Sequence, residues 1–121
     1  MTATWTGTPI TELISVTPSG NGRVAVSGEV DCSTAPRLTA CVEAVLASGP
    51  AELVVDLTGV SFLDSAGLHA LVSAHTAAGR LGVPMRVLVA TRAVLRPIQV
   101  TGLEHVLHIE RVSVGVRTGA A

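Results

Sequence analysis

An apolar run followed closely by the start of a helix constrains this chain more than any other feature. Residues 52–57 (Glu-Leu-Val-Val-Asp-Leu) are apolar enough for a strand buried on both faces or nearly so. A short loop is expected over residues 58–64, and a helix is expected to begin at Ser65. Because a strand of this kind needs helices packed on its sheet, the segment favours an α/β fold that holds the Ser65 hydroxyl in place while leaving it in contact with solvent.

The rest of the chain alternates strand-like and helix-like segments after an opening hairpin. Further strands are expected at residues 13–16, 23–28 and 85–89, and helices at residues 33–47, 65–81 and 92–101. Asn21-Gly22 is a strong hairpin signal between the first two strands. Pro97 lies inside the last predicted helix and makes it short, kinked or late to begin. This order predicts a mixed β-sheet of about four to five strands with helices packed against it.

The chain length of 121 residues fits one compact domain. We expect that domain at residues 12–111, between a flexible N-terminal segment (1–11) and a loose C-terminal tail (112–121). Residues 103–109 are expected to form a last short helical turn or strand. Because aromatic residues make up only 2% of the chain, its core must consist of Val, Leu, Ile and Ala.

Composition excludes several classes of function. All eight cations are arginines, so no lysine is present for a Walker-type phosphate loop or a Schiff base. The net charge of −1 gives no general attraction to nucleic acid or anionic lipid. No apolar run approaches the roughly 20 residues that span a bilayer, and residues 1–9 lack the pattern of a secretory signal. We therefore expect a cytoplasmic protein that binds neither nucleic acid nor membrane, with Cys32 and Cys41 as reduced thiols.

Each of the two longer predicted helices has one apolar face. The first is expected to bury Ala35, Leu38, Val42, Val45 and Leu46. The second is expected to bury Leu68, Leu71, Val72, His75 and Ala78. Ser33 or Thr34 can cap the start of the first helix. In the second helix, His69 follows Ser65 by four residues, so the two side chains lie on the same polar side, one turn apart.

Three segments together resemble the STAS domain family, which anti-sigma factor antagonists and sulphate transporters share. Residues 27–31 (Ser-Gly-Glu-Val-Asp) resemble its Gly-Glu-Leu-Asp signature. Residues 56–68 resemble its signature strand, loop and helix start, and residues 95–107 resemble its closing segment. The run Asp-Ser-Ala-Gly-Leu at residues 64–68 is the most specific part. A free-standing domain of this length looks like the antagonist branch.

The resemblance implies a function and the residues that carry it. Antagonists of this kind bind an anti-sigma factor that is also an ATP-dependent serine kinase, and so release a sigma factor. The kinase phosphorylates a serine at the start of the second helix, which switches the antagonist off, and a PP2C-type phosphatase restores it. The matching serine here is Ser65, and Asp31 and Asp64 match acidic positions that flank it. With Gly67 and His69, these two aspartates form the predicted partner surface.

Elementary chemistry is consistent with a phosphate on Ser65. A serine at the start of a helix is commonly a cap, and the unpaired amides and dipole of a helix start tolerate a phosphate. Phosphorylation adds about −1.5 to −2 charges beside Asp64, and like charges that meet across an interface cost several kcal/mol. We therefore expect the phosphate to act on partner binding rather than on the fold. Asp31 either fixes the loop and caps the following helix or contacts the partner.

Two other interpretations stay open. A serine hydrolase needs a Gly-x-Ser-x-Gly turn, but Leu63 stands at the first glycine position, and His69 is the sole nearby candidate base. A scaffold or transport-accessory domain would share the fold without sigma control, and its partners would distinguish it. His105 and His108 lack a third metal ligand. We therefore predict a non-enzymatic binding module with no catalytic residue, metal or cofactor.

Overall fold

The computed structural model describes residues 14–18 and 22–112. Its described strands form one sheet in the order β2 (Ile14–Pro18), β3 (Arg23–Val30), β4 (Leu53–Leu63), β5 (Met85–Val89) and β6 (Ile109–Arg111). β2 pairs antiparallel with β3, and the other neighbouring strands pair in parallel. The predicted mixed sheet of four to five strands is confirmed. The predicted flexible N-terminal segment, and the predicted tail after Val112, lie outside the described residues.

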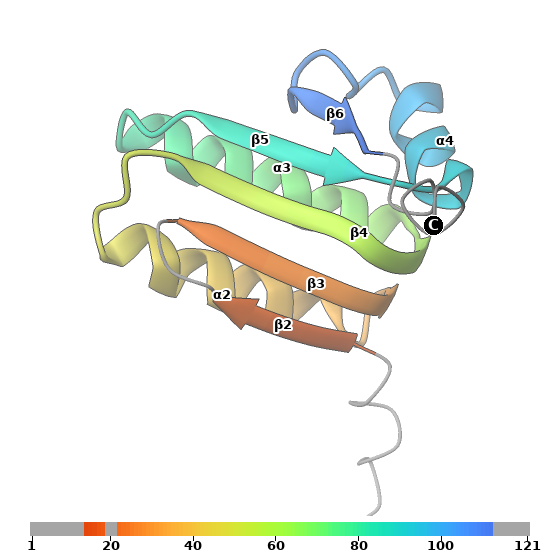
Figure 1. The fold of residues 1–121 in the computed structure, drawn as a ribbon, viewed down its shortest axis with the longest axis horizontal. Coiled ribbons are helices and arrows are strands. Elements are labelled where there is room, and N and C mark those ends of the chain that lie inside the picture. The colour runs from red at the N-terminus through yellow and green to blue at the C-terminus, as the bar shows by residue number, and fades with distance from the viewer. Residues whose placement is uncertain (1–13, 19–21, 113–121) are drawn as a thin grey trace, which may run out of the picture.

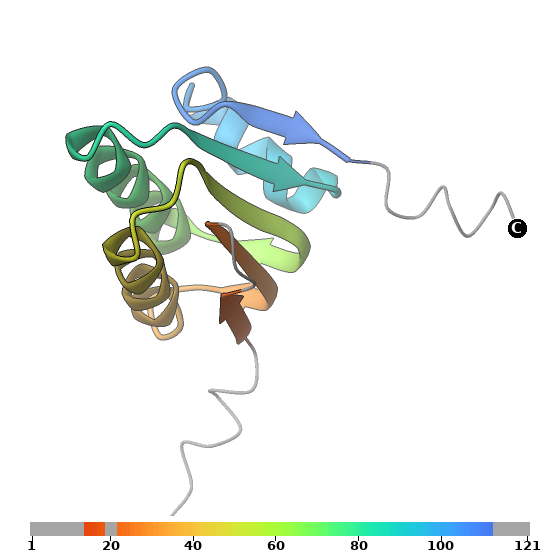
Figure 2. The ribbon, with the colours of Figure 1, turned by 60° about the vertical axis from the view of Figure 1, so that its left-hand side comes forward.

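Helices connect the parallel strands. α2 (Ala35–Ala47) and α3 (Ser65–Arg80) lie side by side on one face of the sheet (Figures 1 and 2). α4 (Arg92–Val100) packs mainly against β4. α4 has nine residues, which confirms the short helix expected from Pro97. Turns over residues 101–108 lead from α4 to β6.

The sheet face opposite α2 and α3 is charged at its centre. Arg23 on β3 pairs with Asp56 on β4 at 2.6 Å. Arg86 on β5 pairs with Glu52 at 2.8 Å and with Glu110 on β6 at 3.0 Å. Even so, Val54 on this face is buried, and Glu52 and Asp56 are half-buried. The prediction that residues 52–57 are buried on both faces or nearly so is therefore confirmed.

The helices bury most of the residues that their periodicity predicts. All five residues predicted for α2 are buried, as are Leu68, Leu71 and Ala78 in α3. Val72 and His75 are only half-buried, which corrects the prediction for them. Ala70 and Ala74 are buried instead. This side of α3 faces α2, and small side chains allow two helices to pack closely.

β4 continues to Leu63, although a loop was predicted from residue 58 onward. Its pairing with β3 contains register shifts, between Ala25 and Ser27 and between Gly28 and Glu29, and such irregularities absorb extra residues without ending a strand. Gly59 suits this crowded place because a Cβ there would lie 2.9 Å from the Ser27 Cβ. Asp64 alone then separates β4 from α3, which fixes the start of α3 closely to the sheet.

Candidate functional site

The carboxyl ends of β3 and β4 bring the predicted polar residues to one edge of the sheet. Val30 lies opposite Leu63 in the parallel pairing, so the next residues, Asp31 and Asp64, are neighbours across the two strands. The Asp64 N–H also donates a hydrogen bond to the Val30 carbonyl at 3.2 Å. Ser65 follows as the first residue of α3. Two carboxylates and a hydroxyl from separate parts of the chain therefore share one small surface.

Asp64, and not Ser65, caps α3. Its Oδ1 accepts hydrogen bonds from the N–H groups of Ala66 at 2.9 Å and Gly67 at 3.1 Å. Its carbonyl accepts the first helical bond, from the Leu68 N–H at 3.0 Å. The prediction of Ser65 as a cap is wrong because the residue before it holds the extended backbone conformation and the short acceptor that a cap requires.

Ser65 is exposed, and no hydrogen bond of its side chain is found within the described residues. The backbone amides that were expected to stabilise a phosphate are partly occupied, because two of them already donate hydrogen bonds to the Asp64 carboxylate. A phosphate on Ser65 would therefore lie beside a carboxylate, and the amides at the start of the helix would not fully compensate its charge. Its charge would remain at the surface.

Asp31 fixes the turn between β3 and α2. Its Oδ1 accepts hydrogen bonds from the Ser33 hydroxyl at 2.7 Å, the Ser33 N–H at 2.9 Å and the Thr34 N–H at 3.2 Å. The hydrogen bonds from Ser33 hold the pKa of this carboxyl below its usual value, so Asp31 is ionised at neutral pH. Neither Ser33 nor Thr34 caps α2 with its side chain. Instead the buried Thr34 hydroxyl donates to the Glu29 carbonyl at 2.9 Å, which fastens the turn to the end of β3.

Gly67 is buried under the first turn of α3 and packs against the sheet. A Cβ at this position would clash with Leu63 Cδ1 and would lie 3.0 Å from Val30 Cγ1. Only a hydrogen atom fits without movement of these core side chains. The contribution of Gly67 to the predicted partner surface is therefore indirect, since it sets the depth at which α3, and with it Ser65, sits on the sheet.

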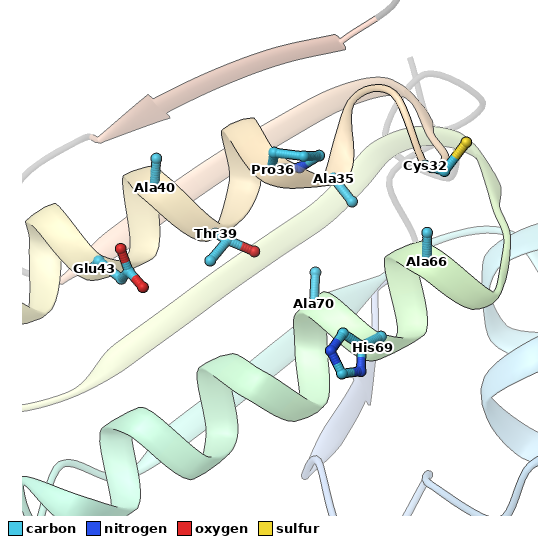
Figure 3. A pocket seen from close by; sticks show the side chains of 9 residues that line it. All are labelled: Cys32, Ala35, Pro36, Thr39, Ala40, Glu43, Ala66, His69 and Ala70. Carbon is cyan, nitrogen blue, oxygen red and sulfur yellow. The ribbon is translucent and has the colours of Figure 1, made fainter.

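A groove of about 430 Å³ runs between α2 and α3 next to Ser65 (Figure 3). Small side chains form most of its walls: Ala35, Pro36, Ala40, Ala66 and Ala70. His69 lines it from α3 and Glu43 from α2, while Cys32 lies in the turn at one end. The helical spacing predicted that His69 lies near Ser65, but it did not predict the wall of the groove that α2 forms. Closely spaced alanines in both helices were the available signal.

An exposed aromatic residue also lies close to this surface. Phe62, near the end of β4, is 46% exposed and stands two residues before Asp64. Aromatic side chains are enriched where proteins bind one another. Phe62, one of the two aromatic residues of the chain, was not among the predicted partner residues. Its place two residues before the Asp-Ser-Ala-Gly-Leu run was the signal that could have assigned it to the surface.

The geometry does not favour hydrolysis at Ser65. His69 is exposed and lines the groove, and no hydrogen bond joins it to Ser65 within the described residues. In the same part of the chain, no group of three or more His, Cys, Asp or Glu side chains is placed to hold a metal ion. None of the helices that the structure describes is long and apolar enough to span a membrane.

Comparison with known proteins decides the family. The model of the STAS domain matches residues 13–114. The chain belongs to the STAS domain family. Among its relatives, the anti-sigma-F factor antagonist RsfB of Mycobacterium tuberculosis is 36% identical over 94 residues, which are 75% of this chain and 76% of that protein.

Solved structures agree with this STAS assignment. An anti-sigma factor antagonist from Mycobacterium paratuberculosis matches with a TM-score of 0.72 and 34% identity, over 88% of this chain and 91% of that chain. The Bacillus protein SpoIIAA in its phosphorylated form matches with a TM-score of 0.62 over 88% of this chain and 97% of that chain. At 14% identity, that likeness shows the fold alone. The relatives are antagonists and not enzymes, so the prediction of a non-enzymatic regulator is confirmed.

Proposed function

We propose that this STAS domain binds an anti-sigma factor, and that phosphorylation of Ser65 switches the binding off. The anti-sigma factor is also an ATP-dependent serine kinase, so capturing it frees a sigma factor in the cytoplasm. A PP2C-type phosphatase removes the phosphate and restores binding. The antagonist relatives support the partner class. The observation that carries the switch is the exposed Ser65, which follows Asp64 directly and lies at the same edge of the sheet as Asp31.

The proposed partner surface contains Asp31, Asp64, Ser65 and His69, with Phe62 as an addition. Within the described residues, the carboxylates of both aspartates accept hydrogen bonds only at Oδ1, which leaves Oδ2 available to a partner. The neighbouring α2–α3 groove offers apolar area for a protruding side chain of the partner. The surface therefore combines a fixed acidic edge with an aromatic side chain and an apolar groove, a mixture typical of protein–protein interfaces.

The switch follows from the chemistry of the transfer. The Ser65 Oγ attacks the γ-phosphorus of ATP held by the partner, the bond to the β-phosphate oxygen breaks, and the hydroxyl proton passes to a base of the kinase. The product phosphoserine then faces the phosphates of the nucleotide left in the partner. Asp64 adds to the negative charge on the antagonist side, and its carboxylate already occupies two of the amides that could otherwise offset the charge of the new phosphate. Repulsion of several kcal/mol across the interface is enough to release the partner.

The test is an affinity capture from the lysate of the host with four versions of the protein: wild type, Ser65→Ala, Ser65→Asp and Thr76→Asp. Thr76 is exposed on α3 and is eleven residues after Ser65, which is about three turns farther along nearly the same side. It therefore adds the same charge to the same helix at a distance of about 16 Å. Mass spectrometry identifies the captured proteins.

We expect wild type, Ser65→Ala and Thr76→Asp to retain an ATP-binding serine kinase, and Ser65→Asp to retain markedly less. Equal capture by all four proteins would contradict a switch at Ser65. Capture of a membrane transporter in place of the kinase would support the alternative of a transport-accessory domain.

A further inference from the structure

Three arginines line a hollow between α4 and the carboxyl end of β6. Arg92 and Arg96 on α4, and Arg111 at the end of β6, line a cavity of about 170 Å³ together with Gln99 and Leu95. A smaller adjoining hollow shares Arg92 and Arg111 and reaches the carboxyl end of β5. In open sheets of parallel strands, the carboxyl ends of the strands are the usual place for ligands. The hollow is separate from the α2–α3 groove and does not involve Ser65.

The positive charge of this hollow is not neutralised by the described part of the protein. The side chains of Arg92, Arg96 and Arg111 are exposed and make no ion pair or hydrogen bond with any described residue. Residues 113–121 contain no Asp or Glu. Arg92 and Arg96 stand four residues apart on one helix, an arrangement that is unfavourable for like charges. The fold thus holds three guanidinium groups around one space.

The acidic residues nearest in sequence are engaged elsewhere. Glu110 precedes Arg111 on β6, but successive strand residues point to opposite faces, and Glu110 binds Arg86 on the open face at 3.0 and 3.1 Å. The Glu104 carboxylate accepts a hydrogen bond from the Gln99 side-chain amide at 3.3 Å and does not line the hollow. Within the described residues, the first turn of α4 also lacks a side-chain cap, so its amide groups are not used by an Asp, Ser or Thr oxygen.

We propose that this arginine hollow binds a phosphate group. Guanidinium groups present rigid pairs of N–H donors that match phosphate oxygens, and the start of α4 adds its positive dipole end. The cavity is smaller than the roughly 300–1,000 Å³ of pockets that enclose whole drug-sized ligands. It therefore fits a phosphate or diphosphate group, which is either a free ion or the phosphate end of a nucleotide whose base stays outside. The inference does not depend on the proposed switch at Ser65.

The test is a titration of the isolated protein followed by amide NMR at constant ionic strength, with inorganic phosphate, pyrophosphate and ADP. We expect saturable shifts confined to the amides of residues 91–96 and 111, with pyrophosphate binding more tightly than phosphate. Equal affinity for ADP and pyrophosphate would assign the site to the phosphate groups alone, whereas tighter binding of ADP would identify a nucleotide as the source. Shifts that are spread over the surface and do not saturate by about 10 mM would overturn the proposal.

Variants separate the hollow from general positive charge. Arg96→Gln should weaken pyrophosphate binding about tenfold because it removes one charge-assisted contact. Arg80→Gln is the matched control: Arg80 is exposed at the end of α3, also lacks an ion pair with the described residues, and does not line the hollow. Its loss changes the net charge by the same amount and should leave the affinity unchanged. Equal effects of the two variants would refute a built site.

Discussion

Gly67 and Gly79 both lie in α3, and we predict that replacing each by alanine changes the free energy of unfolding in opposite directions. In α3, Gly67→Ala adds a methyl group that meets Leu63 Cδ1 and stands 3.1 Å from Leu63 Cγ, so a buried leucine must move. Gly79→Ala adds the same methyl group at an exposed position where no atom lies within 4 Å. Neither glycine has a positive φ, so alanine can adopt both backbone conformations.

The magnitudes follow from two opposing effects. Alanine is better than glycine inside a helix by about 0.5–1 kcal/mol, which is the whole effect expected at Gly79. Extra atoms in a packed core cost about 1–3 kcal/mol, so Gly67→Ala should lower the free energy of unfolding by up to about 2.5 kcal/mol after the helix gain is subtracted. For a domain of this size, 1 kcal/mol corresponds to roughly 4 °C in melting temperature.

Urea unfolding followed by far-ultraviolet circular dichroism measures both variants with one method. Stabilisation by Gly79→Ala and destabilisation by Gly67→Ala would support the close seating of α3. If Gly67→Ala were as stabilising as Gly79→Ala, the packing argument for the position of Ser65 would be refuted.

Two further predictions concern the aspartates of the site. Asp64→Ala should lower the free energy of unfolding by about 0.5–2 kcal/mol through loss of the α3 cap, whereas Asp64→Ser should keep most of it; equal losses in urea unfolding would contradict the capping role. Asp31 has a folded pKa below its ordinary value of 3.8, so its contribution to stability is present above that value and is lost as the pH falls through the folded pKa. Carboxyl NMR titration checks the direction, and Asp31→Asn should reduce the slope of stability against pH in that acid range.

Much of the fold was predictable because its signals are local. The helix periodicity of α2 specifies all five of its buried positions, since one apolar face repeats with the helical period. The boundary of β4 was not predictable from local signals. Gly59 and Thr58 suggest a loop, and the strand continues through them because β3 supplies irregular pairing partners from a different part of the chain.

In the candidate site too, some features follow from local sequence signals and others depend on distant parts of the chain. The positions of Asp31, Asp64 and Ser65 at strand and helix ends could be read from sequence, but their common edge depends on the pairing of Val30 with Leu63. The cap was assigned to the wrong residue because Asp64 and Ser65 are both good capping types, and only the backbone conformation chooses between them. The α2–α3 groove depends on how two helices meet, which no single helix pattern contains.

The most direct test of the proposed switch is the affinity of the captured anti-sigma factor for this protein with and without phosphate on Ser65. Calorimetric titration of the fully phosphorylated and the unmodified protein, with the melting temperature of each as a control for folding, separates an effect on the interface from an effect on the fold. We predict binding weakened at least tenfold, equivalent to about 1.4 kcal/mol, with little change in melting temperature. Equal affinity of the two forms would contradict the switch.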